Sequence, residues 1–337
     1  MSPRKPSVTA QDVARLAGVS RAVVSRALSS NGSISPDARA RVLRAAEELG
    51  YQVNFLAQGL NRQRSHLIGV IVSRISDPFR SALLDALLNE IQRQGFQALV
   101  SEIHSEQDLA HTLRRFTQFR VSGVIVTSGQ PPEALVNECV QQHIPVVGIN
   151  RQPTIPGVDY VCSDNVAGAE LAADQLLRSG CRRFGWLNHS PSTWAGRMRG
   201  EAFSRALQAR GVDVERNLAI LACPEEGYTG GFQAAALADE ALEGIFCANA
   251  QIACGFLDGM RQRGKQAPED YQLIGFDNTP PTAQYSYQLT TLHQDVAAIS
   301  SQTLARLQER TVDPLQPSRT TWVEVTLIHR RTSPFII

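Results

Sequence analysis

Residues 9–28, TAQDVARLAGVSRAVVSRAL, predict two short helices joined by a tight turn. Thr9 can N-cap the first helix. Its apolar positions follow helical i, i+3, i+4 spacing and are Val13, Leu16 and Ala17. Gly18 supplies the positive φ that a sharp turn needs, and Ser20 can N-cap the second helix. The pattern is typical of a helix-turn-helix, which binds DNA; an ordinary helical hairpin is the alternative.

The second helix of this motif would enter the major groove of DNA. The residues it would turn outward are Arg21, Ala22, Ser25 and Arg26. Arginine can grip the O6 and N7 atoms of guanine, so we expect Arg21 and Arg26 to read sequence. A third helix is predicted from Ser35 to Gly50. The residues expected to position the head on phosphates are Thr9, Ser20, Ser35, Tyr51 and Asn54.

Charge is distributed unevenly along the chain. Residues 1–64 hold ten Lys/Arg against four Asp/Glu, a net charge of +6. The remainder holds 23 against 28, a net charge of −5, so the overall value of +1 conceals a basic head on an acidic body. A basic module of this kind favours a partner rich in phosphates, such as double-stranded DNA.

Length and composition limit what the rest of the chain can be. A head plus about 270 residues is too large for one simple core, so two lobes are expected in the body. No apolar run approaches the ~20 residues of a membrane span. The N-terminus MSPRKPSV lacks an apolar signal segment, which favours a cytoplasmic protein with reduced, mostly buried cysteines. No histidine or cysteine spacing predicts a metal site, and no cofactor is expected.

From residue 67 onward, strand and helix patterns alternate. The expected strands are 67–72, 96–101, 123–127, 145–149, 158–162, 183–188, 218–222, 242–249 and 271–278. The expected helices are 77–94, 106–120, 132–143, 167–179, 197–210, 228–239 and 250–263. Such alternation predicts parallel sheets covered on both faces, and the number of units predicts two doubly wound α/β sheets in succession.

Ligands of open α/β sheets bind beyond the carboxyl ends of the strands. The polar residues at these ends include Asp77, Asn150, Arg151, Asn249 and Asp277. Asp and Asn side chains can bind the hydroxyls of a sugar or ribose. The alternative is that they act as helix N-caps or turn formers.

The whole chain, from about Val8 to Arg330, resembles LacI/GalR-type bacterial transcription regulators. The matching head residues are Val8, Asp12, Val13, Ala14, Ala17, Gly18, Val19, Ser20, Val24, Ser25 and Arg26. In the body the matching motifs are Asp77-Pro78-Phe79, Asp164-Asn165 with Gly168, Arg197-x-x-Gly200, Cys247-Ala248-Asn249 and Gly275-Phe276-Asp277. Asn54, Ala57 and Leu60 match the hinge helix of the family.

The resemblance implies a DNA-binding head at 1–53, a hinge helix or linker at 54–64, and an effector-binding and dimerisation domain at 65–337. That domain would have the fold of periplasmic sugar-binding proteins, with an N-lobe at about 65–162 and 292–320. Its C-lobe would span about 163–291 and 321–337. The hinge helices of a dimer would enter the minor groove, with Leu60 of each chain between base pairs.

The effector would lie in the cleft between the lobes. The residues implied to bind it are Asp77, Phe79, Arg80, Asn150, Arg151, Trp194, Arg197, Asn249 and Asp277. Departures from the family pattern are Arg80 in place of an aromatic, Asn150 in place of an acid, and Ala250 after Asn249. Three arginines, Arg80, Arg151 and Arg197, favour an anionic effector unless they are merely solvated or ion-paired. Trp194 is a stacking platform in the cleft, a core residue or a residue buried at an interface.

The expected function is that of a sequence-specific, homodimeric DNA-binding regulator, a repressor controlled by a sugar or sugar derivative. Two other interpretations are a cytosolic sugar-binding protein and a sugar-modifying enzyme. The chain has no G-x-G-x-x-G after its first strand, no P-loop and no G-x-S-x-G elbow, so nothing in it predicts catalysis. The sequence leaves open which compound is the effector, and whether it acts as inducer or corepressor.

Overall fold

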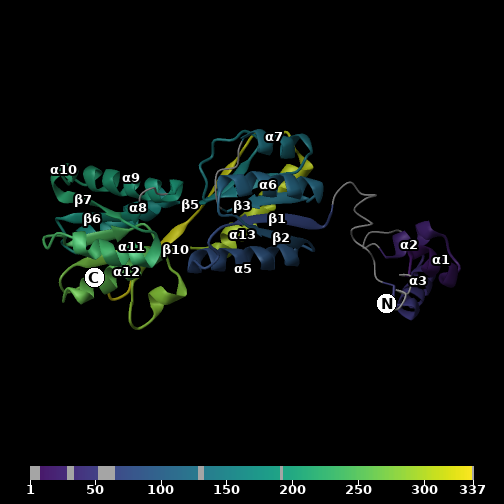
Figure 1. The fold of residues 1–337 in the computed structure, drawn as a ribbon, viewed down its shortest axis with the longest axis horizontal. Helices are drawn as coiled ribbons and strands as arrows, with labels where there is room; N and C mark the ends of the chain where they lie inside the picture. The colour runs from purple at the N-terminus through teal and green to yellow at the C-terminus, as the bar shows by residue number, and fades with distance from the viewer. Residues whose placement is uncertain (1–7, 29–33, 52–64, 128–132, 190–192, 336–337) are drawn as a thin grey trace. The chain divides into compact units, whose positions relative to one another are not determined.

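The computed structural model describes residues 8–28, 34–51, 65–127, 133–189 and 193–335. The chain divides into two compact units, a head within residues 1–65 and a body of residues 66–337 (Figure 1). The predicted hinge at 54–64, with Asn54, Ala57 and Leu60, lies outside the described residues. Among the described helices, none is long and apolar enough to cross a membrane.

The described part of the head consists of α1 (Ala10–Ala17), α2 (Arg21–Ala27) and α3 (Pro36–Leu49). Thr9 and Asp12 form a capping box at the start of α1, and Gly18 ends the helix at φ 62°. These contacts confirm the predicted turn between two helices. The buried stripe of α1 differs from the prediction, because Ala14 is buried while Leu16 is 47% exposed. Val13, Ala14 and Ala17 pack with buried residues of α2 and α3, which leaves Leu16 on the solvent side.

The N-lobe of the body is built on a six-stranded sheet in the order β11-β5-β4-β3-β1-β2. All of its neighbouring strands pair in parallel. The strands are β1 (Leu67–Val72), β2 (Gln97–Glu102), β3 (Gly123–Val126), β4 (Val146–Ile149), β5 (Asp159–Ser163) and β11 (Thr320–Val323). The helices are α5 (Pro78–Arg93), α6 (Glu106–Gln118), α7 (Glu133–Gln141) and α13 (Val296–Val312).

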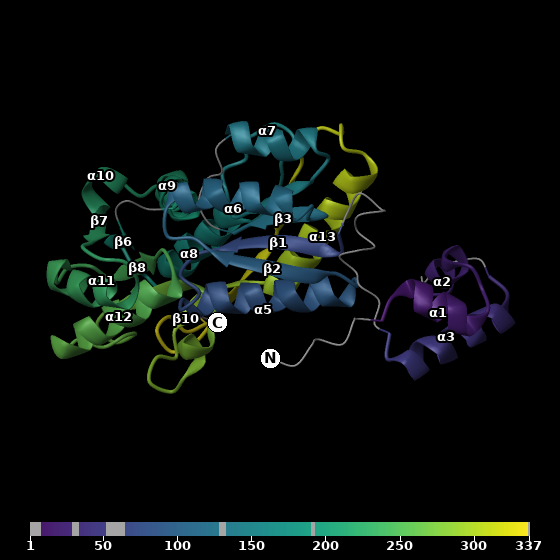
Figure 2. The same ribbon diagram turned by 45° about the vertical axis from the view of Figure 1, so that its right-hand side comes forward.

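Helices cover both faces of this sheet. Figure 2 shows α5 on one side of β1 and β2 and α6 on the other. Leu87 of α5 and Leu304 of α13 belong to one buried cluster, whereas Leu113 of α6 and Val136 of α7 belong to a second. The inner strands β1, β3, β4 and β5 are therefore buried on both faces, which explains why β1, β3 and β4 read as continuous apolar runs, whereas the edge strands β2 and β11 are partly exposed.

The C-lobe is built on a second six-stranded sheet in the order β12-β10-β9-β8-β6-β7. Its strands are β6 (Phe184–His189), β7 (Leu218–Cys223), β8 (Gly244–Cys247), β9 (Gln272–Asp277), β10 (Thr290–Gln294) and β12 (Val325–Ile328). Its helices are α8 (Asn165–Arg178), α9 (Trp194–Ala209), α10 (Val214–Asn217), α11 (Gly227–Ala234) and α12 (Ala250–Gln262), with 3-10 turns η1 (Ala235–Leu237) and η2 (Pro280–Ala283). The last strand, β12, runs antiparallel to β10, which the alternating pattern did not predict.

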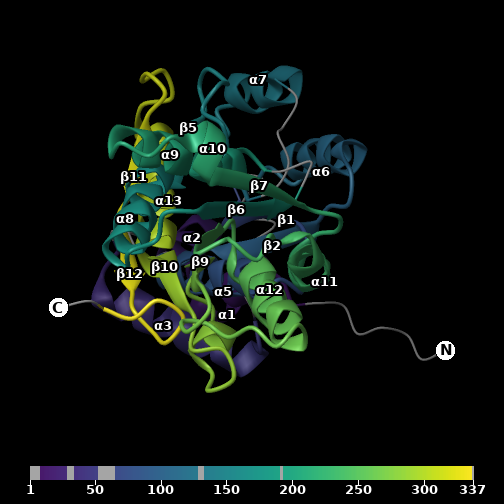
Figure 3. The same cartoon turned by 90° about the vertical axis from the view of Figure 1, so that its left-hand side faces the viewer.

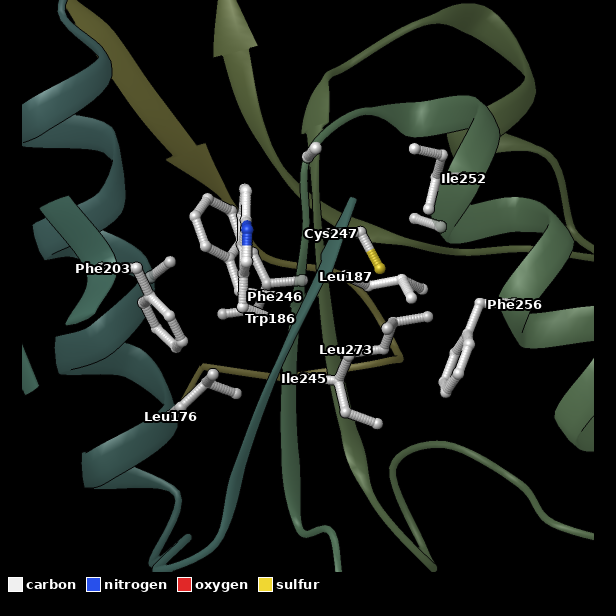
Figure 4. Close-up of a cluster of buried hydrophobic side chains, with 14 of the residues drawn as sticks. Leu176, Trp186, Leu187, Phe203, Ile245, Phe246, Cys247, Ile252, Phe256 and Leu273 are labelled. Carbon is white, nitrogen blue, oxygen red and sulfur yellow. The ribbon is translucent and has the colours of Figure 1, made fainter. Parts of the chain in front are cut away.

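The C-lobe core lies on both sides of its sheet. In Figure 3, α8 and α9 lie on one side of β6 and α11 and α12 on the other. Figure 4 shows Phe203 and Leu176 packed from the first pair, with Phe256 and Ile252 on the opposite side of Phe246. All six cysteines are buried in the body, without disulfide bonds. The predicted class, a two-sheet α/β body with a small helical head, is confirmed.

The chain crosses between the two sheets three times. β5 ends at Ser163, β10 ends at Gln294, and β11 ends at Val323 just before β12 begins. The second and third crossings therefore fall about three residues later than the expected lobe limits at 292 and 320. The difference arises because β10 pairs with β12 as far as Gln294, and β11 pairs with β5 as far as Val323, before the chain passes to the other sheet.

Two helices of the C-lobe approach one another through glycines. A Cβ atom on Gly255 of α12 would overlap the carbonyl oxygen of Tyr228 in α11, and one on Gly231 would overlap that of Ile252. These obstacles are backbone atoms, which cannot rotate away as a side chain can.

We predict that Gly255→Ala destabilises the protein by about 1–3 kcal/mol, as overpacking does. In an open helix the same change would stabilise by about 1 kcal/mol. Denaturant unfolding of the full chain measures the difference. Gln262→Ala, at the exposed end of the same helix, serves as the control and should change stability by less than about 0.5 kcal/mol. A Gly255→Ala protein as stable as wild type would contradict the close approach.

Candidate DNA-reading helix and effector cavity

The predicted base-reading residues share one surface of α2. Arg21, Ala22, Ser25 and Arg26 are exposed, while Val24 and Ala27 are buried in the head core. The Nε atom of Arg26 donates to the carbonyl of Ala22 at 3.4 Å. The exposed surface is thus basic and starts at the N-terminus of the helix, the end that a helix-turn-helix presents to bases.

Three of the expected phosphate-positioning residues are helix N-caps. Thr9, Ser20 and Ser35 accept hydrogen bonds from the backbone N–H groups of Asp12, Val23 and Ala38. All three are exposed, and Tyr51 is half-buried against the head core. Each cap residue therefore stabilises its helix, and it lies beside backbone N–H groups suited to a phosphate. Asn54, Ala57 and Leu60 lie outside the described residues.

The body contains a cavity of about 410 Å³ between its two lobes, at the carboxyl ends of the parallel strands. This volume falls within the range of roughly 300–1,000 Å³ typical of small-molecule sites. Seven of the nine predicted effector residues line the cavity: Asp77, Phe79, Arg80, Asn150, Arg151, Asn249 and Asp277. They come from both lobes, so a molecule held here would touch both sheets.

Two predicted effector residues do not line the cavity. Trp194 packs against the N-lobe core, with its ring centroid 6.4 Å from that of Trp322. Arg197 is exposed on α9, whereas Arg199, two residues later, lines the cavity. The helical period explains the difference, because Arg199 shares the buried face of α9 with Ala195 and Phe203.

Arg199 is held in place on several sides. Its Nε donates to Oδ1 of Asn165 at 2.7 Å, and its Nη1 donates to the carbonyl of Ala248 at 2.5 Å. The guanidinium carbon lies 3.4 Å from the centre of the Phe276 ring, and Nη1 lies 3.8 Å from Oδ1 of Asp277. Burial lowers the pKa of Arg199 to about 10, so the group remains a cation at neutral pH.

Gln294, which sequence reasoning missed, connects the lobes beside the cavity. Its Oε1 accepts hydrogen bonds from Ser163 Oγ at 2.6 Å and from Asn150 Nδ2 at 3.3 Å. Its Nε2 donates to Oδ1 of Asp277 at 2.6 Å. Gln294 and Ser163 are the last residues of β10 and β5, two of the three strands from which the chain crosses, so this network lies at two of the crossings.

Two cavity residues also serve as helix N-caps. Asp77 Oδ1 accepts from the N–H groups of Phe79 and Arg80, and Asn249 Oδ1 accepts from that of Ile252. The N-cap interpretation of these strand-end residues is therefore correct, and the same residues line the cavity. The ends of α5 and α12 are thereby fixed at opposite walls of the site.

Asp277 is a buried carboxyl of the cavity whose pKa is raised. Burial raises its pKa to about 6, and the Arg199 cation only partly opposes this effect. Its backbone has φ 88°, in the left-handed region, and its Oδ2 accepts from the N–H of Ala250 at 3.2 Å. Because the ordinary value is 3.8, the folded protein binds a proton here more tightly than the unfolded chain does.

We predict a pH-dependent difference in stability between wild type and Asp277→Asn. The raised pKa of Asp277 gives wild type a contribution that is fully present below about pH 4 and lost as pH rises through about 6. The free energy of unfolding of wild type, relative to that of Asp277→Asn, should therefore fall by about 2–3 kcal/mol between pH 4 and pH 7. Urea unfolding across this range measures it. A difference independent of pH would contradict the raised pKa.

Comparisons with known proteins agree with this arrangement. Residues 9–54 match the family described as bacterial regulatory proteins, lacI family, and residues 173–333 match the periplasmic binding protein-like domain. The chain is 33% identical over 297 residues to the transcriptional regulator GalS of Salmonella typhimurium, covering 87% of each protein.

Solved structures show the same fold. The lac repressor dimer bound to operator and the anti-inducer ONPF superposes with a TM-score of 0.84 at 22% identity, covering 98% of this chain and all of that one. A ribose-bound LacI family regulator from Enterococcus faecium has a TM-score of 0.72 at 26% identity, covering 80% of this chain and all of that one. The chain belongs to the LacI family of bacterial transcription regulators.

Proposed function

We propose that this protein is a homodimeric repressor in the cytoplasm that binds a two-fold symmetric operator and changes its operator affinity when a small molecule binds between its lobes. The supporting observation is that one chain carries both a basic helix-turn-helix surface and a polar cavity lined from two lobes. A single small head makes few contacts, so two heads on one operator supply the affinity. The relatives named above are described as transcription regulators, which favours regulation over catalysis.

The coupling between cavity and head would arise from movement of the lobes. A ligand that contacts residues of both lobes stabilises one relative arrangement of the sheets over others. The N-lobe continues directly from the segment that follows the head, so its position would set the spacing of two heads in a dimer. The two alternative interpretations, a cytosolic sugar-binding protein and a sugar-modifying enzyme, would account for the cavity. Neither gives a role to the basic surface of α2.

We predict that Arg21→Ala costs about 1–3 kcal/mol of binding free energy on the operator and little on random DNA. Arg21 is exposed at the first position of α2, where a guanidinium can reach guanine. Fluorescence anisotropy on a site selected from a random library measures both affinities. Arg41→Ala, an exposed arginine of α3 paired with Asp37, serves as the control. Equal losses on the two DNAs would make Arg21 a phosphate contact.

We predict that Arg199→Gln weakens effector binding at least tenfold, whereas Arg197→Gln changes it less than twofold. The two arginines are neighbours on α9, but only Arg199 lines the cavity. The ligand is the compound that raises or lowers operator affinity in a screen of sugars, sugar acids, sugar phosphates and nucleosides, and calorimetry measures how tightly the protein binds it. A larger loss of effector affinity in Arg197→Gln than in Arg199→Gln would show that Arg197 binds the effector and that Arg199 has a structural role.

A further inference from the structure

The N-lobe wall of the cavity is strongly basic. Among its described residues it carries three arginines, Arg74, Arg80 and Arg151, and a single carboxylate, Asp77. Arg74 forms an ion pair with Glu226 on the opposite wall, so its charge is matched from the C-lobe. Asp77 uses Oδ1 to accept two backbone N–H groups of α5. The carboxylates of the cavity are thus largely committed to other partners.

Arg151 is held by groups that orient it without neutralising it. Its Nη2 donates to the carbonyl of Thr127 at 2.7 Å, and its Nε donates to that of Ile149 at 3.2 Å. Burial and the neighbouring Arg80 and Arg74 cations lower the pKa of Arg151 to about 10, with Cys162 opposing them. A guanidinium remains protonated at that value, so its positive charge stays within the half-buried wall.

Arg80 is anchored beside it. Its Nη1 donates to the carbonyl of Ser73 at 3.0 Å and to the Ser73 hydroxyl at 2.5 Å. Burial and the Arg74 charge lower its pKa, and Asp77 and Asp277 partly offset the effect. The two guanidiniums act on one another as like charges, so a ligand that brought no negative charge would displace water and strengthen their repulsion.

We infer that the effector carries an anionic group, a carboxylate or a phosphate, that Arg80 and Arg151 bind. Guanidinium groups fixed in place suit the planar oxygen pair of either anion. The opposite wall, with Asp277, Asn249 and Asn188, offers acceptors and amides suited to hydroxyls. The effector class is therefore a sugar acid or a sugar phosphate, an inference that rests on the cavity being the effector site proposed above.

The first test uses inorganic phosphate as the probe. The melting temperature of the full chain is measured with phosphate and with chloride at equal ionic strength, for wild type, Arg151→Met, Arg80→Met and Arg216→Met. Arg216 is an exposed arginine with an 85% accessible side chain, so it serves as the matched control. Phosphate bound to the basic head contributes equally to all four proteins, and their differences report the cavity.

Wild type and Arg216→Met should respond alike, and the two cavity variants should need at least tenfold more phosphate for the same shift. Equal responses in all four proteins would overturn the inference. Arg151→Lys keeps the charge without the planar fork and should respond between wild type and Arg151→Met. The inference would also be overturned if phosphate shifted the melting temperatures of Arg151→Lys and Arg151→Met as much as that of wild type.

The second test uses wild type alone, so it does not depend on the folding of any variant. Calorimetry compares glucose with glucuronate and glucose 6-phosphate, and ribose with ribose 5-phosphate. At least one anionic compound should bind tenfold or more tightly than its neutral parent sugar. Whichever of the sugar acid and the sugar phosphates binds more tightly identifies the anionic group of the effector. Ratios near one in every pair would overturn the inference.

Operator binding, measured with the same compounds for wild type and Arg151→Met, separates the proposed function from the inference of an anionic effector. A neutral sugar that binds and releases operator would support the proposed function and overturn the anionic effector. An anion that binds wild type, but not Arg151→Met, without changing operator affinity would support the anionic ligand and contradict the proposed function.

Discussion

The buried amide of Gln294 is the constraint on which the arrangement of the cavity depends. It lies where the chain leaves one sheet for the other, and its hydrogen bonds join Asn150 and Ser163 of the N-lobe to Asp277 of the C-lobe. A buried polar group left without a partner costs about 1–3 kcal/mol, so each member of this network holds the others in place. The network thereby links strand ends of the two lobes at the crossings, beside the cavity.

The charged side chains around the Gln294 network are held in fixed positions by hydrogen bonds. Asp277, held by Gln294 and the N–H of Ala250, lies near the buried Arg199, and its raised pKa reflects the low polarity of the site. On the other wall Arg80 and Arg151 are fixed by backbone carbonyls. One wall therefore offers hydroxyl-binding groups and the other concentrates positive charge. A ligand that satisfies both walls at once gains from bringing the lobes together, which is the physical basis of the proposed control over DNA binding.

Local patterns in the sequence predicted most of the fold. The cap at Thr9, the turn at Gly18 and the apolar strand runs depend on neighbouring residues, and the structure has them where they were expected. Features that depend on distant residues were not predictable. Gln294 acquires its N-lobe partners, Asn150 and Ser163, from segments more than 100 residues away, and the antiparallel β12 depends on the last crossing. The burial of Arg199 could have been predicted, since it lies four residues before Phe203 on the buried face of α9. The family motif begins at Arg197, however, and the effector role was assigned to that exposed residue instead.

If the cavity and the DNA-reading head are coupled, effector and operator must change each other's affinity by the same factor. Operator affinity is measured by anisotropy with and without saturating effector, and effector affinity by calorimetry with and without saturating operator. Coupling requires the two ratios to be equal, and typical regulators give factors of about 5–150. We predict one common factor in this range. An effector that fills the cavity while operator affinity stays unchanged would contradict it.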